Sequence, residues 1–273
     1  MHAYWCGILS VYRLCGVLVV IRGGIPKDIQ YWNKFMFASI SRVDIDITMV
    51  ISTSLYYQTE VYHLDGMSVV FRLKEDAFIA DSAMKKCVIL PLSNTFNFQV
   101  FTNQIFLTHA VQRHMIQLHA SLIDYHGRGV IFLGPSGIGK TTQAERWMQY
   151  RGASILNGDM VFVQETQGPG KQYLGWGTPW HGSSPYCLNA SVPVKALVVL
   201  KQAPENRLRE LTGFEKVAEV SGSVFYPTWL ENGMELCTDT LNHLLTDLPV
   251  YRLDNRADEE AVNLLAAELD RIT

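Results

Sequence analysis

The stretch Gly134-Pro-Ser-Gly-Ile-Gly139-Lys140-Thr141 decides how the rest of this sequence is interpreted. It matches the pattern G-x-x-x-x-G-K-[ST] at every required position. An apolar run at residues 130–133 precedes it, and a run with helical character at residues 142–147 follows it. A strand, a glycine-rich loop and a helix in this order predict a loop that binds the phosphates of a nucleoside triphosphate, which we expect to be ATP with Mg²⁺.

Each residue type in the loop has a physical role in holding a triphosphate. Glycine lets the backbone come close to phosphate oxygens, so that amide N–H groups can point inward. The N-terminus of the following helix adds partial positive charge. Lys140 is expected to contact the β- and γ-phosphates, and the Thr141 hydroxyl to bind Mg²⁺. The expected nucleotide-binding residues are Gly134, Pro135, Ser136, Gly137, Ile138, Gly139, Lys140, Thr141 and Thr142.

The sequence on both sides of the loop alternates between strand-like and helix-like segments from residue 118 onward. The expected strands are 118–125, 129–133, 153–156, 160–164, 194–201 and 250–253. The expected helices are 141–150, 236–245 and 259–271. This alternation predicts an α/β core over residues 116–273.

Residues 1–115 have a different character. Short β-rich runs predict an antiparallel, strand-dominated N-terminal region. These runs cover residues 4–9, 17–22, 47–52, 68–73, 87–90 and 98–101. An amphipathic helix is expected over 103–117.

Composition excludes several classes of protein. Of the 273 residues, 48% are apolar, which is enough to fill a core. The net charge of −3 gives no electrostatic reason to expect a nucleic acid or an anionic membrane as partner. The five cysteines contain no C-x-x-C pair, so we expect reduced, buried thiols. Arg13 interrupts the apolar run at residues 7–21. We therefore expect two strands there and neither a membrane span nor a signal peptide. The protein is expected to be cytoplasmic.

Two segments near the loop supply candidate catalytic side chains. His119-Ala-Ser121 opens the strand before the loop, and Asn157-Gly158-Asp159 ends the strand after the loop helix. With the loop, these motifs resemble the HPr kinase/phosphorylase-like P-loop kinases, whose fold is related to the phosphoenolpyruvate carboxykinases. The resemblance covers residues 118–159 with good motifs and is weaker beyond them. It implies that His119 and Asp159 belong to the active site and that Asp159 helps to bind Mg²⁺.

Residue 158 departs from the pattern of that family. The family carries an Asp-Asp pair there, for metal binding and for activation of the attacking hydroxyl, whereas this chain has Gly158-Asp159. One carboxylate must then perform both tasks, or another group must supply one of them. Asp159 is the favoured base, and its alternative is a turn aspartate that satisfies its own backbone.

A shaped loop at residues 176–184 is the third candidate segment. It contains two glycines, a proline and two tryptophans, with His181 and two serines near its tip. Loops of this composition often carry binding groups. His181 is expected to orient or deprotonate an acceptor hydroxyl or to contact the γ-phosphate. The alternative is a loop packed by its tryptophans.

Four other functions compete with a kinase. A GTPase is disfavoured because Asn255-Arg-Ala-Asp258 has arginine in place of the lysine of N-K-x-D, and it more simply caps a helix. An ATP-driven assembly protein is disfavoured because this chain lacks a full Walker B strand. A carboxykinase is disfavoured because such an enzyme would be longer. A nucleotide-binding module without catalysis stays open.

The sequence therefore predicts an ATP-dependent kinase with a β-rich N-terminal region and an HPr-kinase-like core. Lys140, Asp159, His119 and His181 are the expected catalytic residues, and Thr141 and Asp159 the expected Mg²⁺ ligands. The acceptor is expected to be a hydroxyl of a protein, a peptide or a small molecule. The sequence leaves a homo-oligomer open and predicts neither a nucleic-acid nor a membrane partner.

Overall fold

The structure is a computed structural model that describes residues 9–22, 27–38, 43–49, 68–73, 76–81, 83–90 and 95–271. The chain divides into two compact units, Met1–His109 and Ala110–Thr273. Strands and helices occur in both units, so the protein is of the mixed α/β type that the sequence predicts.

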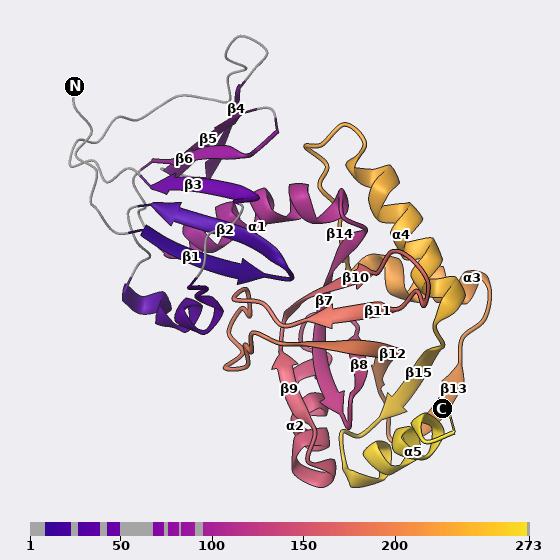
Figure 1. Cartoon of the computed structure of the whole chain (residues 1–273). Helices are drawn as coiled ribbons and strands as arrows, with labels where there is room; N and C mark the ends of the chain where they lie inside the picture. Colours follow the sequence, from indigo (N-terminus) through magenta and orange to yellow (C-terminus); the bar gives the residue numbers. More distant parts are fainter. Residues whose placement is uncertain are drawn as a thin grey trace, which may run out of the picture. The chain divides into compact units, whose positions relative to one another are not determined.

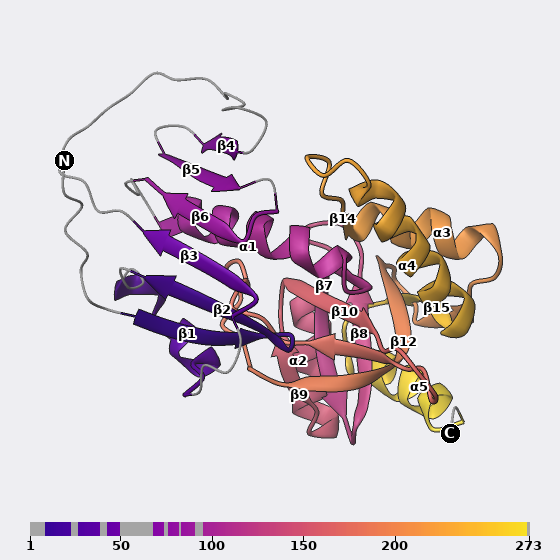
Figure 2. The same ribbon diagram turned by 45° about the horizontal axis from the view of Figure 1, so that its top comes forward.

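The described part of the N-terminal unit contains one sheet of six strands (Figure 2). Its order is β1-β2-β3-β6-β5-β4. The strands are β1 (Leu9–Leu14), β2 (Val17–Arg22), β3 (Ile45–Met49), β4 (Ser68–Leu73), β5 (Asp76–Asp81) and β6 (Lys86–Ile89). The predicted antiparallel arrangement is wrong in part, because β3 pairs in parallel with both β2 and β6. Of the predicted strands, residues 4–8 and 50–52 lie outside the described residues.

A helix, α1 (Thr95–Val111), replaces the strand predicted at residues 98–101. Phe98 and Phe101 lie one helical turn apart, and both are buried. The Phe98 ring packs on Trp32 of the 3₁₀ segment η1 (Lys27–Phe35), with ring centroids 5.5 Å apart. Apolar residues alternate at 96, 98 and 100, which imitates a strand, but Phe96 is 67% exposed in the helix.

The helix predicted over 103–117 ends earlier than expected. After α1 ends at Val111, His114 adopts a φ of 53° and the next strand begins at Met115. A left-handed backbone conformation is incompatible with continuing an α-helix. The predicted helix is therefore correct only for its first two turns.

The C-terminal unit is built on a nine-stranded sheet (Figure 1). Its main path runs β11-β10-β7-β8-β12-β15-β13, and β9 and β14 also pair with β7. The strands are β7 (Met115–Tyr125), β8 (Arg128–Leu133), β9 (Ser154–Asn157), β10 (Met160–Glu165), β11 (Tyr173–Trp176), β12 (Ser191–Gln202), β13 (Arg207–Glu210), β14 (Val224–Phe225) and β15 (Val250–Asn255). The helices are α2 (Lys140–Arg151), α3 (Phe214–Val220), α4 (Gly233–Asp247) and α5 (Glu259–Leu269), with a 3₁₀ turn η2 (Ser221–Ser223).

Strands β8, β12 and β15 are parallel neighbours, so their carboxyl ends share one edge of the sheet. β9 runs in the same direction as β8, because both pair antiparallel with β7. The glycine-rich loop follows β8, and Gly158-Asp159 follows β9. Ligands of open α/β sheets bind at this kind of edge.

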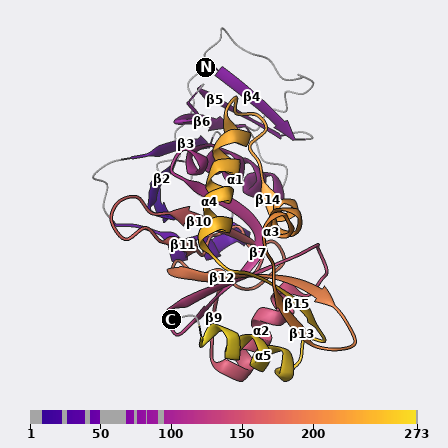
Figure 3. The same cartoon turned by 90° about the vertical axis from the view of Figure 1, so that its right-hand side faces the viewer.

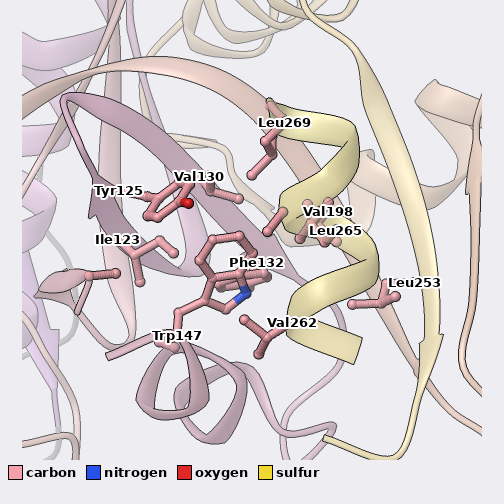
Figure 4. Packing of buried hydrophobic residues seen from close by; sticks show 14 of the residues in the cluster. Ile123, Tyr125, Val130, Phe132, Trp147, Val198, Leu253, Val262, Leu265 and Leu269 are labelled. Atoms are coloured by element: carbon pink, nitrogen blue, oxygen red, sulfur yellow. The ribbon is translucent and has the colours of Figure 1, made fainter. Parts of the chain in front are cut away.

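Two helices, α2 and α5, lie side by side on one face of this sheet (Figures 1 and 3). Trp147 of α2 is fully buried and meets the Tyr125 ring edge to face, with ring centroids 5.0 Å apart. Around it gather apolar side chains of the strands and of α5 (Figure 4). They include Ile123, Val130, Phe132, Val198, Leu253, Val262, Leu265 and Leu269. This packing holds α2, and so the loop before it, against the end of β8.

The cysteines of the described residues are all free and buried: Cys15, Cys87, Cys187 and Cys237. Burial raises the pKa of the Cys237 thiol to about 12. Cys6 lies outside the described residues. Within the described ranges, no helix has the length and apolar character needed to cross a bilayer.

Candidate active site

The glycine-rich loop joins the buried end of β8 to the first turn of α2. Gly134, Gly137 and Gly139 have φ angles of 140°, 78° and 106°, a region that other residues rarely enter. Gly139 is the N-cap of α2, and no side chain caps this helix end. The N-terminus of α2 therefore presents backbone N–H groups and partial positive charge to the loop, which suits an anion.

Lys140 lies over the loop and is buried. Its Nζ donates to the carbonyl oxygens of Gly134, at 2.9 Å, and Pro135, at 3.2 Å. Burial lowers the pKa of this ammonium group, and the negative charge of Asp159 opposes part of that shift. Its contacts with the loop carbonyls and its attraction to Asp159 place the Lys140 charge between the loop and the carboxylate that follows β9.

A pocket of about 370 Å³ opens in front of the loop. It is lined by His119, Ser136, Gly137, Gly139, Lys140, Thr141, Thr142, Gly158, Asp159, Ser183, Ser184 and Pro185. Most of the predicted site residues thus meet in one place. Gly134, Pro135, Ile138 and His181 do not line it: the first two accept from Lys140, and Ile138 packs against the apolar cluster around Trp147.

Asp159 and His119 face each other across paired strands. His119 Nε2 lies 3.1 Å from Asp159 Oδ1, and the two side chains are 30% and 24% exposed. The register of β7 and β10 explains this contact, because Met160 pairs with His119 and the Ala120 amide donates to the Asp159 carbonyl. The imidazole therefore fixes one oxygen of a carboxylate that stays open to the pocket.

Gly158 is held by two hydroxyl groups. Thr141 Oγ1 donates to the Gly158 carbonyl oxygen at 3.0 Å, and Ser121 Oγ donates to the same oxygen at 3.2 Å. Ser121 is two residues from His119 on β7, so both side chains lie on one face of the strand. Because the Thr141 hydroxyl donates its hydrogen bond to this carbonyl, the lone pairs of its oxygen are available for a cation in the pocket.

The loop at residues 176–184 is fixed to the end of β9 by Asn157, which is fully buried. Asn157 Nδ2 donates to the carbonyls of Thr178 and Trp180, at 3.0 and 3.2 Å. Its Oδ1 accepts from the amides of Asp159 and Met160, at 2.8 and 2.9 Å. One side chain therefore positions both the loop and the backbone of Asp159.

The same loop approaches Asp159 through a glycine. A Cβ on Gly182 would lie 2.3 Å from Asp159 Oδ2, so only glycine allows this approach. His181 does not line the pocket, and its Nδ1 contacts the Ser184 carbonyl. His181 shapes the turn in this structure, whereas Ser183 and Ser184 line the pocket.

We predict that Asn157→Ala destabilises the protein by roughly 2–3 kcal/mol, because it leaves several buried backbone groups without their partner. Urea unfolding measures this free energy. Asn242→Ala, on the exposed side of α4, is the control and is expected to change stability by less than about 0.5 kcal/mol. Equal effects of the two substitutions would show that Asn157 does not hold the loop.

The side chains that border the pocket suit ATP and Mg²⁺. A phosphate needs amide donors and a positive charge, which the loop and Lys140 supply. Mg²⁺ in nucleotide sites is bound by one or two protein oxygens together with phosphates and waters. The Thr141 hydroxyl and the Asp159 carboxylate are a donor set of this size and hardness.

Several contributors to the site were not predicted from the sequence. Ser121, Gly182 and Ser184 act through contacts that depend on how distant strands and loops meet. Phe225 is another, since its ring lies beside that of His119 with centroids 6.4 Å apart. The only sequence signal was position, because Ser121 is two residues from His119 and Ser184 lies in the candidate loop.

The fold and the site define an α/β protein with a glycine-rich loop before a helix and a carboxylate–histidine pair beside it. The chain belongs to the family of the SynChlorMet cassette protein ScmC, whose model matches residues 86–248, more than half of the chain. Among solved structures, it is similar to the Hpr(Ser) kinase/phosphatase from Coxiella burnetii, with 12% identity over 56% of this chain and 98% of that chain. The TM-score is 0.33, so the function is argued from the site alone. A comparison with curated proteins gave no match.

Proposed function

We propose that this protein is an ATP-dependent kinase that transfers the γ-phosphate of ATP to a hydroxyl group. The observation that carries the proposal is the position of the Asp159 carboxylate, which borders the same pocket as Lys140, Thr141 and the glycine-rich loop. His119 holds this carboxylate at the border of the pocket, where it can serve an acceptor hydroxyl as well as a cation. The proposal includes the HPr-kinase-like core, related to phosphoenolpyruvate carboxykinases, that the motifs resemble.

Each side chain has a role in the proposed transfer. The loop amides and Lys140 bind the triphosphate, and the Lys140 ammonium exchanges its two carbonyl partners for phosphate oxygens. Mg²⁺, when bound by Thr141 and Asp159, supplies charge neutralisation on the phosphates. Asp159 accepts the proton of the acceptor hydroxyl. The acceptor oxygen forms a bond to the γ-phosphorus, the bond from that phosphorus to the bridging oxygen breaks, and ADP leaves.

His119 supports this step by orienting Asp159. Its Nε2 contacts Oδ1 of the carboxylate, which leaves Oδ2 for the acceptor proton. His181 contributes indirectly, because its ring holds the turn that presents Ser183 and Ser184 to the pocket. The acceptor class that we propose is a hydroxyl of a protein, a peptide or a small molecule.

The test is transfer of label from γ-labelled ATP to a lysate, separated into protein and small-molecule fractions. We expect label in one of these fractions with the wild-type protein and none with Lys140→Ala. Tight ATP binding without labelled product or released phosphate would identify a nucleotide-binding protein without kinase activity. Label on the enol oxygen of a 2-oxo acid that has lost a carboxyl group as CO₂ would instead favour a small carboxykinase-like enzyme.

We predict that Thr141→Ala weakens binding of Mg·ATP at least roughly 10-fold while metal-free ATP binds almost as before. The hydroxyl contacts the cation, whereas the loop amides contact the phosphates. Calorimetric titrations with and without Mg²⁺ separate the two effects. Thr246→Ala, on the exposed face of α4, is the control. Equal losses in the presence and absence of Mg²⁺ would count against a metal ligand at Thr141.

A further inference from the structure

Gly158 has no side chain, yet the space beside it is filled. A Cβ built on Gly158 would lie 1.9 Å from Ser184 Oγ and 2.6 Å from Ser184 Cβ. Such distances do not occur between real atoms, so the Ser184 side chain occupies the place into which a side chain of residue 158 would extend. Gly158 and Ser184 are therefore a coupled pair, although they lie 26 positions apart in the sequence.

The Ser184 hydroxyl lies on the side of the pocket where Thr141 lies. The same built Cβ would be 3.7 Å from Thr141 Cγ2, so Thr141 and Ser184 surround one point. Both residues line the pocket, and Ser184 is only 8% exposed. The oxygen of Ser184 is thus a buried polar group in the same pocket as Thr141, the residue whose hydroxyl we expect to bind the cation.

Hydrogen bonds of its backbone and of its hydroxyl hold Ser184 in place. The Ser184 amide donates to the His181 carbonyl at 2.9 Å, and the His181 ring contacts the Ser184 carbonyl. The Tyr186 amide donates to Ser184 Oγ at 3.3 Å. Tyr186 in turn donates its hydroxyl to Glu145 Oε1 on α2, at 3.2 Å. Ser184 is therefore tied to the helix that carries Thr141.

We infer that Ser184 is a positioning residue for the divalent cation that binds with ATP. Its oxygen has a second lone pair, which accepts a hydrogen bond from a water of the hydrated Mg²⁺ ion. Ser184 thus supplies, from another loop, the polar group that residue 158 lacks. The inference rests on the proposed function, because it requires Mg·ATP in this pocket.

The binding test compares ATP affinity with and without Mg²⁺ in wild type, Ser184→Ala and Ser191→Ala by calorimetry. We expect the gain in ATP affinity that Mg²⁺ provides to fall roughly 10-fold in Ser184→Ala, as is common when an outer-sphere partner of a metal is lost. Metal-free ATP should bind Ser184→Ala as it binds wild type. Ser191→Ala removes an exposed hydroxyl at the start of β12, which does not line the pocket, and is expected to keep the gain.

A second test uses folding and needs no ligand. Gly158→Ala is expected to lower the Tm clearly in the wild-type background, because its Cβ would collide with Ser184. In a Ser184→Gly background, the same substitution should change the Tm little. This second pair also covers the case in which Ser184→Ala does not fold.

Three outcomes would overturn the inference. The first is a full Mg²⁺ gain in Ser184→Ala, and the second is an equal loss with and without Mg²⁺, which would indicate a structural role alone. The third is a Tm loss for Gly158→Ala that is the same in both backgrounds. A wild-type protein that binds no ATP would overturn both the inference and the proposed function, whereas the first three outcomes leave the proposed function standing.

Discussion

Lys140→Ala is expected to reduce ATP affinity at least roughly 100-fold while the protein keeps its fold. Hydrogen bonds to charged groups contribute about 1.5–3 kcal/mol each, and about 1.4 kcal/mol corresponds to a factor of ten in affinity. The ammonium has two carbonyl partners, both within the loop, and we propose that phosphate oxygens take their place. Among the described residues that line the pocket, Lys140 is the one lysine or arginine, and the substitution removes its charge.

The fold should survive because the ammonium is costly to bury. Burial lowers the pKa of Lys140, which means that the charged form loses hydration in the folded protein. Alanine at this position removes that cost along with two hydrogen bonds, and it is a good helix former at the start of α2. Circular dichroism and calorimetry should therefore give separate answers for folding and for binding.

Lys195→Ala is the matched control, since this lysine lies near the amino end of β12, away from the loop. We expect it to bind ATP as wild type does. Wild-type ATP affinity in Lys140→Ala would remove the glycine-rich loop from the proposed site, and the kinase proposal would fall with it.

The parts of the fold that the sequence predicted are those with short-range causes. The strand, loop and helix around Gly134–Thr141 depend on neighbouring residues, and they occur where the pattern places them. The strands β8 and β12 are also correct, because buried stretches of strands appear as continuous apolar runs. The strand order and the parallel pairing of β3 depend on contacts between distant segments, which no local pattern records.

The site shows the same division. Lys140, Thr141 and Asp159 border one pocket, as their motifs predicted, and His119 reaches Asp159 through strand register. The relation between Gly158 and Ser184 was not predictable, because it arises only when the loop after β11 folds against the end of β9. His181 was singled out for its chemistry, but the neighbouring Gly182 is the residue that approaches Asp159.

Asp159→Asn is expected to lower turnover by roughly 10²–10⁴-fold, the range that general-base assistance contributes. Asparagine keeps the shape of the side chain and can still offer an oxygen to a cation, so ATP binding should fall far less than turnover. A misplaced metal would add to the loss. His181→Ala is the comparison, because its ring lies off the pocket lining and should affect turnover only through the position of the turn.

The same substitution has a consequence for Lys140 that can be measured without a phosphoryl acceptor. Burial lowers the pKa of Lys140, and the charge of Asp159 raises it in part. Removing that charge lowers the Lys140 pKa further, so the ammonium loses its proton at a lower pH than in wild type. ATP binding by Asp159→Asn should therefore weaken at a lower alkaline pH than binding by the wild-type protein. Calorimetric titrations across the alkaline range, together with turnover at saturating Mg·ATP, test both effects. Near wild-type turnover in Asp159→Asn, with no shift in the alkaline limb of ATP binding, would show that this carboxylate acts neither as the base nor on Lys140. A larger loss of turnover in His181→Ala than in Asp159→Asn would give the role of base to the histidine.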